Sequence, residues 1–117
     1  MNELRIEERT LSSAPLVILS GELTFDSAPD LRDILLAHTK AKRPHIVVML
    51  GELQFMDTSG LATLIEARTK ADAYGGTVIL VALSPMIRQV FEIARVTGLF
   101  TIADDEQAAL SAVGPGQ

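Results

Sequence analysis

The sequence predicts a single α/β domain built around a mixed β-sheet. Residues 46–50 are apolar at every position, which is typical of a strand covered on both faces. Segments with apolar residues at helical three-and-four spacing alternate with such runs. The 117 residues, of which 48% are hydrophobic, can bury one core but leave no room for a second domain. We therefore expect one domain over residues 1–113, with a sheet of four to five strands and about four helices, and a disordered tail over residues 114–117.

The N-terminal residues predict an antiparallel hairpin. Leu4 and Ile6 alternate with charged neighbours, which indicates a half-buried strand at the edge of the sheet. The turn-forming residues 12–15 connect it to a second strand over residues 16–19, and a connection this short favours an antiparallel pair. Gly21 is expected to end the second strand.

A first helix should follow, from Ser27 to about Lys40. Ser27 and Asp30 have the spacing of a capping box, and Pro29 suits the first turn, where its missing N–H costs little. The side chains expected to pack on the sheet recur at three-and-four spacing: Ala28, Leu31, Ile34, Leu35 and His38.

The middle of the chain predicts a β-α-β unit. Residues 46–50 form the candidate central strand, and a second helix should run from about Ser59 to Tyr74. The double glycine that follows supplies the left-handed backbone that ends many helices, and residues 77–83 predict another buried strand. Two strands joined through a helix are expected to be parallel.

The C-terminal part predicts two more helices and a short strand. Ser84 followed by Pro85 is typical of a helix start, and Gly98 is expected to stop this helix. Residues 99–102 favour a short last strand. Residues 104–113 should form a final helix, because two aspartates place negative charge at its start.

The composition excludes several classes of function. A formal net charge of −5 opposes non-specific nucleic-acid binding, and an aromatic content of 4% leaves no base-stacking platform. The chain has no cysteine, so disulfides and zinc sites built on thiolates are excluded, and we expect neither a metal nor a cofactor. No apolar run approaches the ~20 residues of a membrane span. We expect a cytoplasmic protein that binds no nucleic acid and does not insert into a membrane.

Residues 56–61 hold the candidate site, because an apolar run ends there and a helix begins among two hydroxyls and a carboxylate. As a catalytic nucleophile, Ser59 would need a base within hydrogen-bond reach. His38 is expected near the end of the first helix and His45 at the opposite end of the central strand, so neither is placed to activate it. Asp57 also occupies the position of the first glycine in a G-x-S-x-G elbow. We therefore expect no catalytic residue.

Capping alone would explain the run of Asp57, Thr58 and Ser59, because each side chain can accept a hydrogen bond from the free N–H groups of a helix start. One cap, however, needs only one side chain. If Asp57 or Thr58 takes that role, Ser59 lies in the first turn with its hydroxyl pointing outward, where phosphorylation would add about −1.5 to −2 charges. A partner matched to the neutral surface would then meet like charge or lose a hydrogen bond.

Five short segments, in this order and spacing, are similar to the signatures of a known family. They are Gly21-Glu22-Leu23, Phe55-Met56-Asp57-Thr58-Ser59-Gly60-Leu61, Gly75-Gly76, Ser84-Pro85 and Thr97-Gly98-Leu99-Phe100. Over about residues 3–112, the chain resembles STAS domains, specifically those of bacterial anti-sigma factor antagonists. The resemblance implies a STAS-like domain with a mixed sheet and flanking helices.

The resemblance also implies a function. In such antagonists, a serine at the position of Ser59 is phosphorylated by the partner, a serine kinase with the fold of histidine-kinase-like ATPases that is itself the anti-sigma factor. The unphosphorylated antagonist binds this partner and frees the sigma factor for transcription. Phosphorylation ends the binding, and a PP2C-type phosphatase restores it.

The chain departs from the family pattern directly after Gly-Glu-Leu. Antagonists commonly carry Asp there, whereas this chain has Thr24 and then Phe25, with Asp26 two residues on. A Leu-Thr-Phe run is similar to STAS subunits of ABC-type lipid-transport complexes, which bind an ATPase subunit and need no phosphorylation. The segments around Met56 and Ser84 look more like the antagonists.

We therefore expect a phospho-switch protein that is not an enzyme, with Ser59 as the phosphate acceptor. The residues expected to contact the partner are Thr24, Phe25, Asp26, Ser27, Met56, Asp57, Thr58, Gly60, Leu61, Ser84, Pro85 and Met86.

Overall fold

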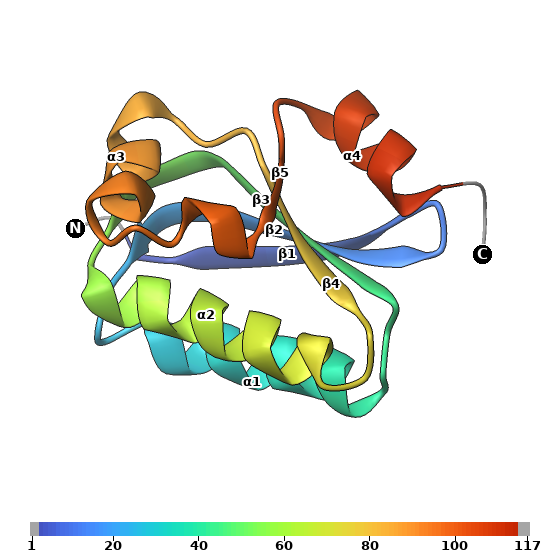
Figure 1. The fold of residues 1–117 in the computed structure, drawn as a ribbon. Coiled ribbons are helices and arrows are strands. Elements are labelled where there is room, and N and C mark those ends of the chain that lie inside the picture. Colours follow the sequence, from blue (N-terminus) through green and yellow to red (C-terminus); the bar gives the residue numbers. More distant parts are fainter. Residues whose placement is uncertain (1–2, 115–117) are drawn as a thin grey trace.

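The computed structural model describes residues 3–114 and shows a five-stranded sheet in the order β1-β2-β3-β4-β5 (Figure 1). β1 pairs with β2 antiparallel, and β2 through β5 are parallel neighbours, which confirms the predicted mixed sheet. The strands are β1 (Arg5–Leu11), β2 (Ala14–Leu23), β3 (His45–Met56), β4 (Thr77–Val81) and β5 (Thr101–Ala103). The helices are α1 (Ala28–Lys40), α2 (Thr58–Asp72), α3 (Pro85–Ile93) and α4 (Glu106–Val113), with a 3-10 helix, η1 (Thr97–Leu99), before β5.

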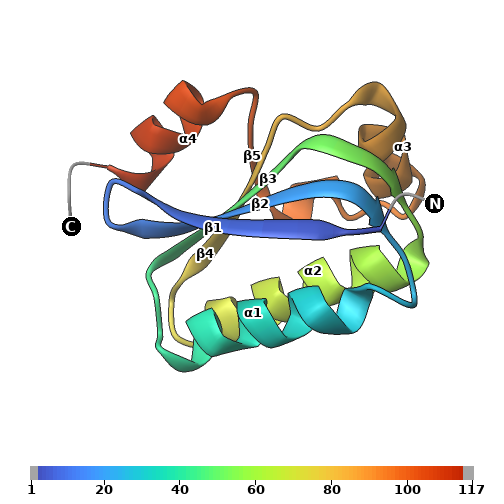
Figure 2. The same cartoon turned by 180° about the vertical axis from the view of Figure 1, so that it is seen from behind.

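Helices cover both faces of the sheet. α1 and α2 lie side by side across one face, whereas α4 lies on the other (Figures 1 and 2). The larger core, between the sheet and the α1–α2 pair, also takes in Ile87 and Phe91 of α3. Phe100 meets Phe91 edge-on, with ring centroids 5.6 Å apart. The α3–η1 segment therefore closes this core beside the sheet.

β3 is the central strand, and it is buried on both faces as predicted. Val47 belongs to the core that includes residues of α4, while Val48 belongs to the core under α1 and α2. The strand is longer than the predicted residues 46–50, because it continues through Gly51 to Met56 beside β2. The register between β2 and β3 shifts twice along this extension. Such irregularities bend a strand, which accounts for the curved path of β3 in Figure 1.

Gly21 does not end β2, and that prediction is wrong. The strand passes through Gly21 and continues to Leu23. Gly21 has a φ of +90°, and a Cβ at this position would collide with the carbonyl oxygen of Glu3. A glycine is needed here because the segment that leads into β1 lies directly against the β2 backbone.

Helix ends deviate more from the sequence-based predictions than helix starts do. α3 stops at Ile93, before the glycine predicted to stop it, because Arg95 takes a left-handed φ of +59° and turns the chain. Gly98 instead lies within η1. The two aspartates do lie at the start of α4, as predicted, and Asp105 also accepts a hydrogen bond from the backbone N–H of Ala108 at 2.9 Å. Of the predicted tail, residues 115–117 lie outside the described residues.

Replacing Gly21 and Gly75 by alanine should separate two energetic costs. Both glycines have positive φ, +90° and +82°, which costs an alanine about 1–2 kcal/mol. A Cβ at Gly75 meets no atom within 4 Å, whereas one at Gly21 collides with the backbone of Glu3. We expect Gly75→Ala to lower the free energy of unfolding by about 1 kcal/mol, and Gly21→Ala to lower it by about 1–3 kcal/mol more, because overpacking adds to the strain. Urea unfolding measures both values. Equal losses would show that the segment before β1 moves aside at no cost.

Candidate functional site

The carboxyl ends of β2 and β3 meet at one edge of the sheet and bring two segments of the candidate site together. Leu23 and Met56, the last residues of the two strands, are register partners. The backbone N–H of Asp57 donates to the carbonyl oxygen of Leu23 at 3.1 Å. The turn at residues 24–27, called here the 24–27 turn, therefore lies beside the start of α2.

Asp57 is the N-cap of α2, and both oxygens of its carboxylate accept hydrogen bonds. Oδ1 accepts from the backbone N–H of Gly60 at 3.1 Å, which is the usual capping contact. Oδ2 accepts from the backbone N–H of Phe25 at 3.0 Å. The cap predicted from local sequence is thus confirmed, and the second bond joins two segments 32 residues apart in the chain.

Ser27 shapes the 24–27 turn rather than capping α1, so the predicted capping box is wrong. Its hydroxyl oxygen accepts from the backbone N–H of Thr24 at 2.9 Å and donates to the carbonyl oxygen of Glu22 at 3.0 Å. The carbonyl oxygen of Thr24 in turn accepts from the N–H groups of Ser27 and Ala28, at 3.1 and 2.7 Å. The turn is therefore held by its own hydrogen bonds at both ends, and Phe25 projects from it with 74% of its surface exposed.

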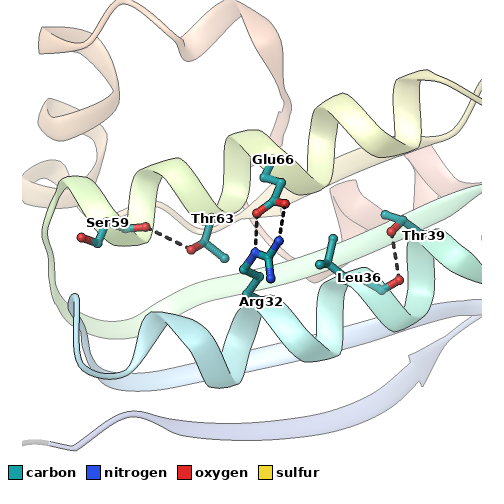
Figure 3. Close-up of polar contacts among 6 residues, drawn as sticks. All are labelled: Arg32, Leu36, Thr39, Ser59, Thr63 and Glu66. Atoms are coloured by element: carbon teal, nitrogen blue, oxygen red, sulfur yellow. Dashed lines mark hydrogen bonds and ion pairs between the residues drawn. The ribbon is translucent and has the colours of Figure 1, made fainter.

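Ser59 lies in the first turn of α2 and is half-buried rather than fully outward-pointing. Its carbonyl oxygen accepts from the hydroxyl of Thr63 at 3.0 Å (Figure 3). Among residues 3–114, no acceptor or donor is found for the Ser59 hydroxyl itself. Thr58, one residue earlier, is exposed. Because Asp57 alone supplies the cap, the hydroxyl of Ser59 is left without a structural role.

Three residues expected to contact the partner form the support of the site instead of its surface. Met56 and Leu61 are buried in the core under α1 and α2. Gly60 is buried as well, and a Cβ there would come within 2.6 Å of Leu23 and 2.9 Å of Met56. The start of α2 thus rests directly on the strand ends, with no space for a larger residue.

Ser84, Pro85 and Met86 start α3 as predicted. The Ser84 hydroxyl oxygen accepts from the backbone N–H of Ile87 at 3.3 Å, and Met86 is 52% exposed. None of these three residues lines the surface that the 24–27 turn forms with Asp57. They form a separate part of the surface expected to contact the partner.

A groove of about 620 Å³ lies beside the 24–27 turn. Sequence reasoning identified the turn residues and Asp57 but missed the groove's other walls, which come from the segment before β1, the end of β2 and the start of α1. The antiparallel pairing of β1 and β2, which sets Arg5 opposite Ser20, is the signal that would have brought the segment before β1 to the end of β2. The groove is negative, because carboxylates supply five of its nine lining residues: Glu3, Leu4, Glu22, Thr24, Phe25, Asp26, Ser27, Asp30 and Asp57.

An ion pair fixes α2 against α1 two turns after Ser59. The guanidinium of Arg32 donates two hydrogen bonds to the carboxylate of Glu66, from Nε to Oε1 at 2.7 Å and from Nη2 to Oε2 at 2.8 Å (Figure 3). These hydrogen bonds hold the pKa of Glu66 below its usual range and raise that of Arg32. The side chains remain 32% and 49% exposed, so salt and water screen the pair.

Neither histidine is placed to activate Ser59. His38 lies about 15 Å along α1 from the helix start, and its Nε2 is 2.9 Å from Glu8 Oε1. His45 begins β3, a 12-residue strand that spans up to roughly 36 Å, and its Nδ1 is 2.8 Å from Thr77 Oγ1. Within residues 3–114, no group of three or more His, Asp or Glu side chains could hold a metal ion. In the same part of the chain, no helix has the length and apolar character to cross a membrane.

Comparison with known proteins identifies the family. The model of the STAS domain matches residues 5–109. No curated protein sequence matches the chain. Among solved structures, an anti-sigma factor antagonist from Mycobacterium paratuberculosis is similar over 95% of this chain and 94% of its own, with a TM-score of 0.86 and 23% identity.

Two further structures share the fold. The Bacillus cell fate determinant SpoIIAA in its phosphorylated form is similar over 95% of this chain and 99% of its own, with a TM-score of 0.72 and 24% identity. A sulfate transporter family protein from Wolinella succinogenes is similar over 85% of this chain and 83% of its own, with a TM-score of 0.74 and 15% identity. At these identities, the likeness shows a shared fold.

The Arg32–Glu66 pair should make stability depend on acid pH. Because the folded-state pKa of Glu66 is depressed, the stabilisation from this pair is present above the unfolded value of about 4.3 and is lost as the pH falls through the lower folded value. We expect Glu66→Gln to flatten the decline in the free energy of unfolding below about pH 4.3 at low salt. Urea unfolding between pH 7 and pH 3 measures the decline. Arg32→Gln is the matched control and should flatten it similarly, whereas an unchanged slope in both variants would contradict the pairing.

Proposed function

The chain belongs to the STAS domain family, and from this premise we propose that it acts as an anti-sigma factor antagonist in the bacterial cytoplasm. It is a binding protein rather than an enzyme, and Ser59 is the residue whose phosphorylation switches the binding off. The unmodified protein binds an anti-sigma factor, and the sigma factor released from that partner becomes available for transcription.

The observation that supports this proposal is that the cap of α2 and the candidate phosphate acceptor are two different side chains. Asp57 caps the helix, so the hydroxyl of Ser59 is not needed for folding. The N–H groups of the first helical turn favour a negative charge nearby, so the fold tolerates a phosphoryl group at this position. Modification therefore changes the surface while leaving the core intact.

The switch follows from the charge of the site. The groove beside the 24–27 turn is already lined by five carboxylates, one of them Asp57, two residues before Ser59. A phosphoryl group adds about −1.5 to −2 charges to this negative surface. A partner that fits the neutral hydroxyl then meets a large, charged group in place of a hydrogen bond, and the contact is lost.

In this proposal the kinase is the anti-sigma factor itself, with the fold of histidine-kinase-like ATPases. It transfers the γ-phosphoryl group of ATP to Oγ of Ser59, the hydroxyl proton leaves, and ADP is released. A PP2C-type phosphatase reverses the modification by hydrolysis, which releases inorganic phosphate and restores the hydroxyl. The protein then binds its partner again.

A second candidate function rests on the exposed ring of Phe25. A Thr24-Phe25 pair after Gly-Glu-Leu resembles STAS subunits of ABC-type lipid-transport complexes, in which the domain binds an ATPase subunit without phosphorylation. The ring's 74% exposure suits an apolar contact of that kind. Stable co-purification with an ABC-type ATPase from the native host would favour this function over the antagonist.

Ser59 should be the only residue that the cognate kinase modifies. Incubation of the protein with the anti-sigma factor and ATP, followed by mass spectrometry, should show one added phosphoryl group, located at Ser59. Ser59→Ala should remain unmodified, while Thr58→Ala, which removes the neighbouring exposed hydroxyl, should be modified like the wild type. Phosphate on Thr58, or on no residue, would contradict the assignment.

Substitutions at Ser59 should separate charge from loss of the hydroxyl. We expect Ser59→Asp to fold normally but to bind the anti-sigma factor at least about tenfold more weakly, because a buried like-charge contact costs about 1.4 kcal/mol or more. Ser59→Ala should keep most of the affinity. Gln107→Asp adds the same charge on α4, on the opposite face of the sheet, and should bind like the wild type. Calorimetric titration measures all three, and equal affinities for Ser59→Asp and Ser59→Ala would remove the electrostatic explanation.

A further inference from the structure

The carboxylate of Asp57 connects the helix that carries Ser59 to the turn that carries Phe25. One oxygen caps α2 through the N–H of Gly60, and the other accepts from the N–H of Phe25, at 3.1 and 3.0 Å. The remaining hydrogen bonds of the 24–27 turn stay within residues 22–30. Among the described residues, the bond to Asp57 is therefore the hydrogen bond that holds the turn against α2.

Phe25 is the side chain whose place depends on this bond. The residue is 74% exposed and lines the groove beside the 24–27 turn. An exposed aromatic ring on a fixed turn is the kind of residue that anchors a protein interface, because it buries a large apolar area at low cost in conformational entropy. The carboxylates that line the groove favour a partner with a basic rim around the pocket that accepts the ring.

We propose that Asp57 is a positioning residue that couples Phe25 to the modification state of Ser59, so that the unmodified protein presents Phe25 as an anchor and phosphorylation releases it. This inference rests on the proposed function and names a second route by which the same site loses its partner. The partner chemistry is an apolar pocket with basic residues around it, on the anti-sigma factor.

The coupling arises because a phosphoryl group on Ser59 and the carboxylate of Asp57 compete for the same free N–H groups at the start of α2. The N–H groups of Thr58 and Ser59 have no acceptor within the helix, and the N–H of Gly60 is held by Asp57 alone. A phosphoryl group on Ser59 brings three strong acceptor oxygens to these donors. The carboxylate of Asp57 only accepts hydrogen bonds, so it cannot bond to the phosphoryl group and is repelled by it.

The bond to Phe25 should yield before the cap does. The Gly60 contact is partly buried beneath the helix start, whereas the Phe25 contact is exposed to water, which can replace the lost acceptor. An exposed hydrogen bond therefore gives way at lower cost than a partly buried one. Once Oδ2 of Asp57 releases the N–H of Phe25, the 24–27 turn keeps its internal hydrogen bonds but loses its fixed position beside α2.

The first part of the test measures the coupling in the protein alone. Phosphoserine is placed at residue 59 during translation, and amide hydrogen exchange is followed residue by residue by NMR. We expect the N–H of Phe25 to exchange roughly tenfold faster or more than in the unmodified protein, as loss of a charge-assisted hydrogen bond implies. Asp57→Asn should give the same result without phosphate, because Asn keeps an oxygen for the cap but offers Phe25 an NH₂ group. The N–H of Ala108, at the capped start of α4, is the internal reference and should not change.

The second part measures what the bond contributes to binding. Phe25 is the second residue of a β-turn closed by the bond from Ser27 N–H to Thr24 oxygen, a position that accepts proline. Phe25→Ala removes the ring but keeps the N–H, and should weaken binding of the anti-sigma factor at least about tenfold if the ring is the anchor. Asp57→Asn keeps the ring, and should weaken binding by several fold without shifting the urea midpoint of unfolding, because Asn caps a helix about as well as Asp. Phe25→Pro, which lacks both ring and donor, should bind no better than Phe25→Ala.

The outcomes separate this inference from the proposed function. If phosphoserine at residue 59 abolishes binding while the exchange of Phe25 N–H stays unchanged, the coupling is overturned and the switch acts at Ser59 directly. If Phe25→Ala binds like the wild type, Phe25 is not the anchor, and the inference is overturned while the switch at Ser59 stands. If no kinase modifies Ser59, yet phosphoserine speeds the exchange of Phe25 N–H, the proposed function fails and the coupling stands.

Discussion

The parallel pairing of β2 with β3 is the constraint on which the whole site depends. It brings Leu23 and Met56 into register at the same edge of the sheet, so the segments that follow them must share that edge. The bond from Asp57 N–H to Leu23 oxygen carries this pairing one residue beyond the strands. Two segments more than thirty residues apart thus form one surface, and the sheet's core, rather than a loop, determines their spacing. A site fixed in this way needs little reordering when a partner binds.

Close packing beneath α2 allows the surface to change without disturbing the fold. Gly60 rests against Leu23 and Met56 with no space for a Cβ, so the first turn of the helix has only one position. Asp57 satisfies the cap, and Arg32 holds Glu66 two turns later. Because the polar and apolar contacts that fix α2 all avoid the hydroxyl of Ser59, this side chain can be altered at little cost to stability.

Periodicity and turn chemistry predicted the elements whose determinants are local or depend on burial. The unbroken apolar run in β3 predicted the central strand because both faces of that strand are covered. The charge of Asp104 and Asp105 predicted the start of α4, because a helix start favours negative charge locally. Predictions failed where a distant contact took over a residue with a local meaning. Ser27 matches a capping box, but its hydroxyl bonds to Glu22 and Thr24 instead. Gly21 looked like a strand end, but its left-handed conformation serves the approach of Glu3. The bond between Asp57 and Phe25 has no local signal, since either residue alone suits several structures.

Thr24 departs from the family pattern, but this departure leaves the site negative and adds an apolar contact surface. Glu22, Asp26 and Asp30 line the same groove, so the edge stays strongly negative without an aspartate at position 24. What the turn gains is the exposed side chain of Phe25, whose backbone N–H donates to the carboxylate that also caps α2. Under the proposed function, recognition would then depend on apolar burial at a fixed position, which salt weakens far less than it weakens charge pairs. In the proposed switch, a phosphoryl group added to this negative surface would repel Asp57 as well as the partner, so that one modification would weaken both the electrostatic and the apolar part of the contact.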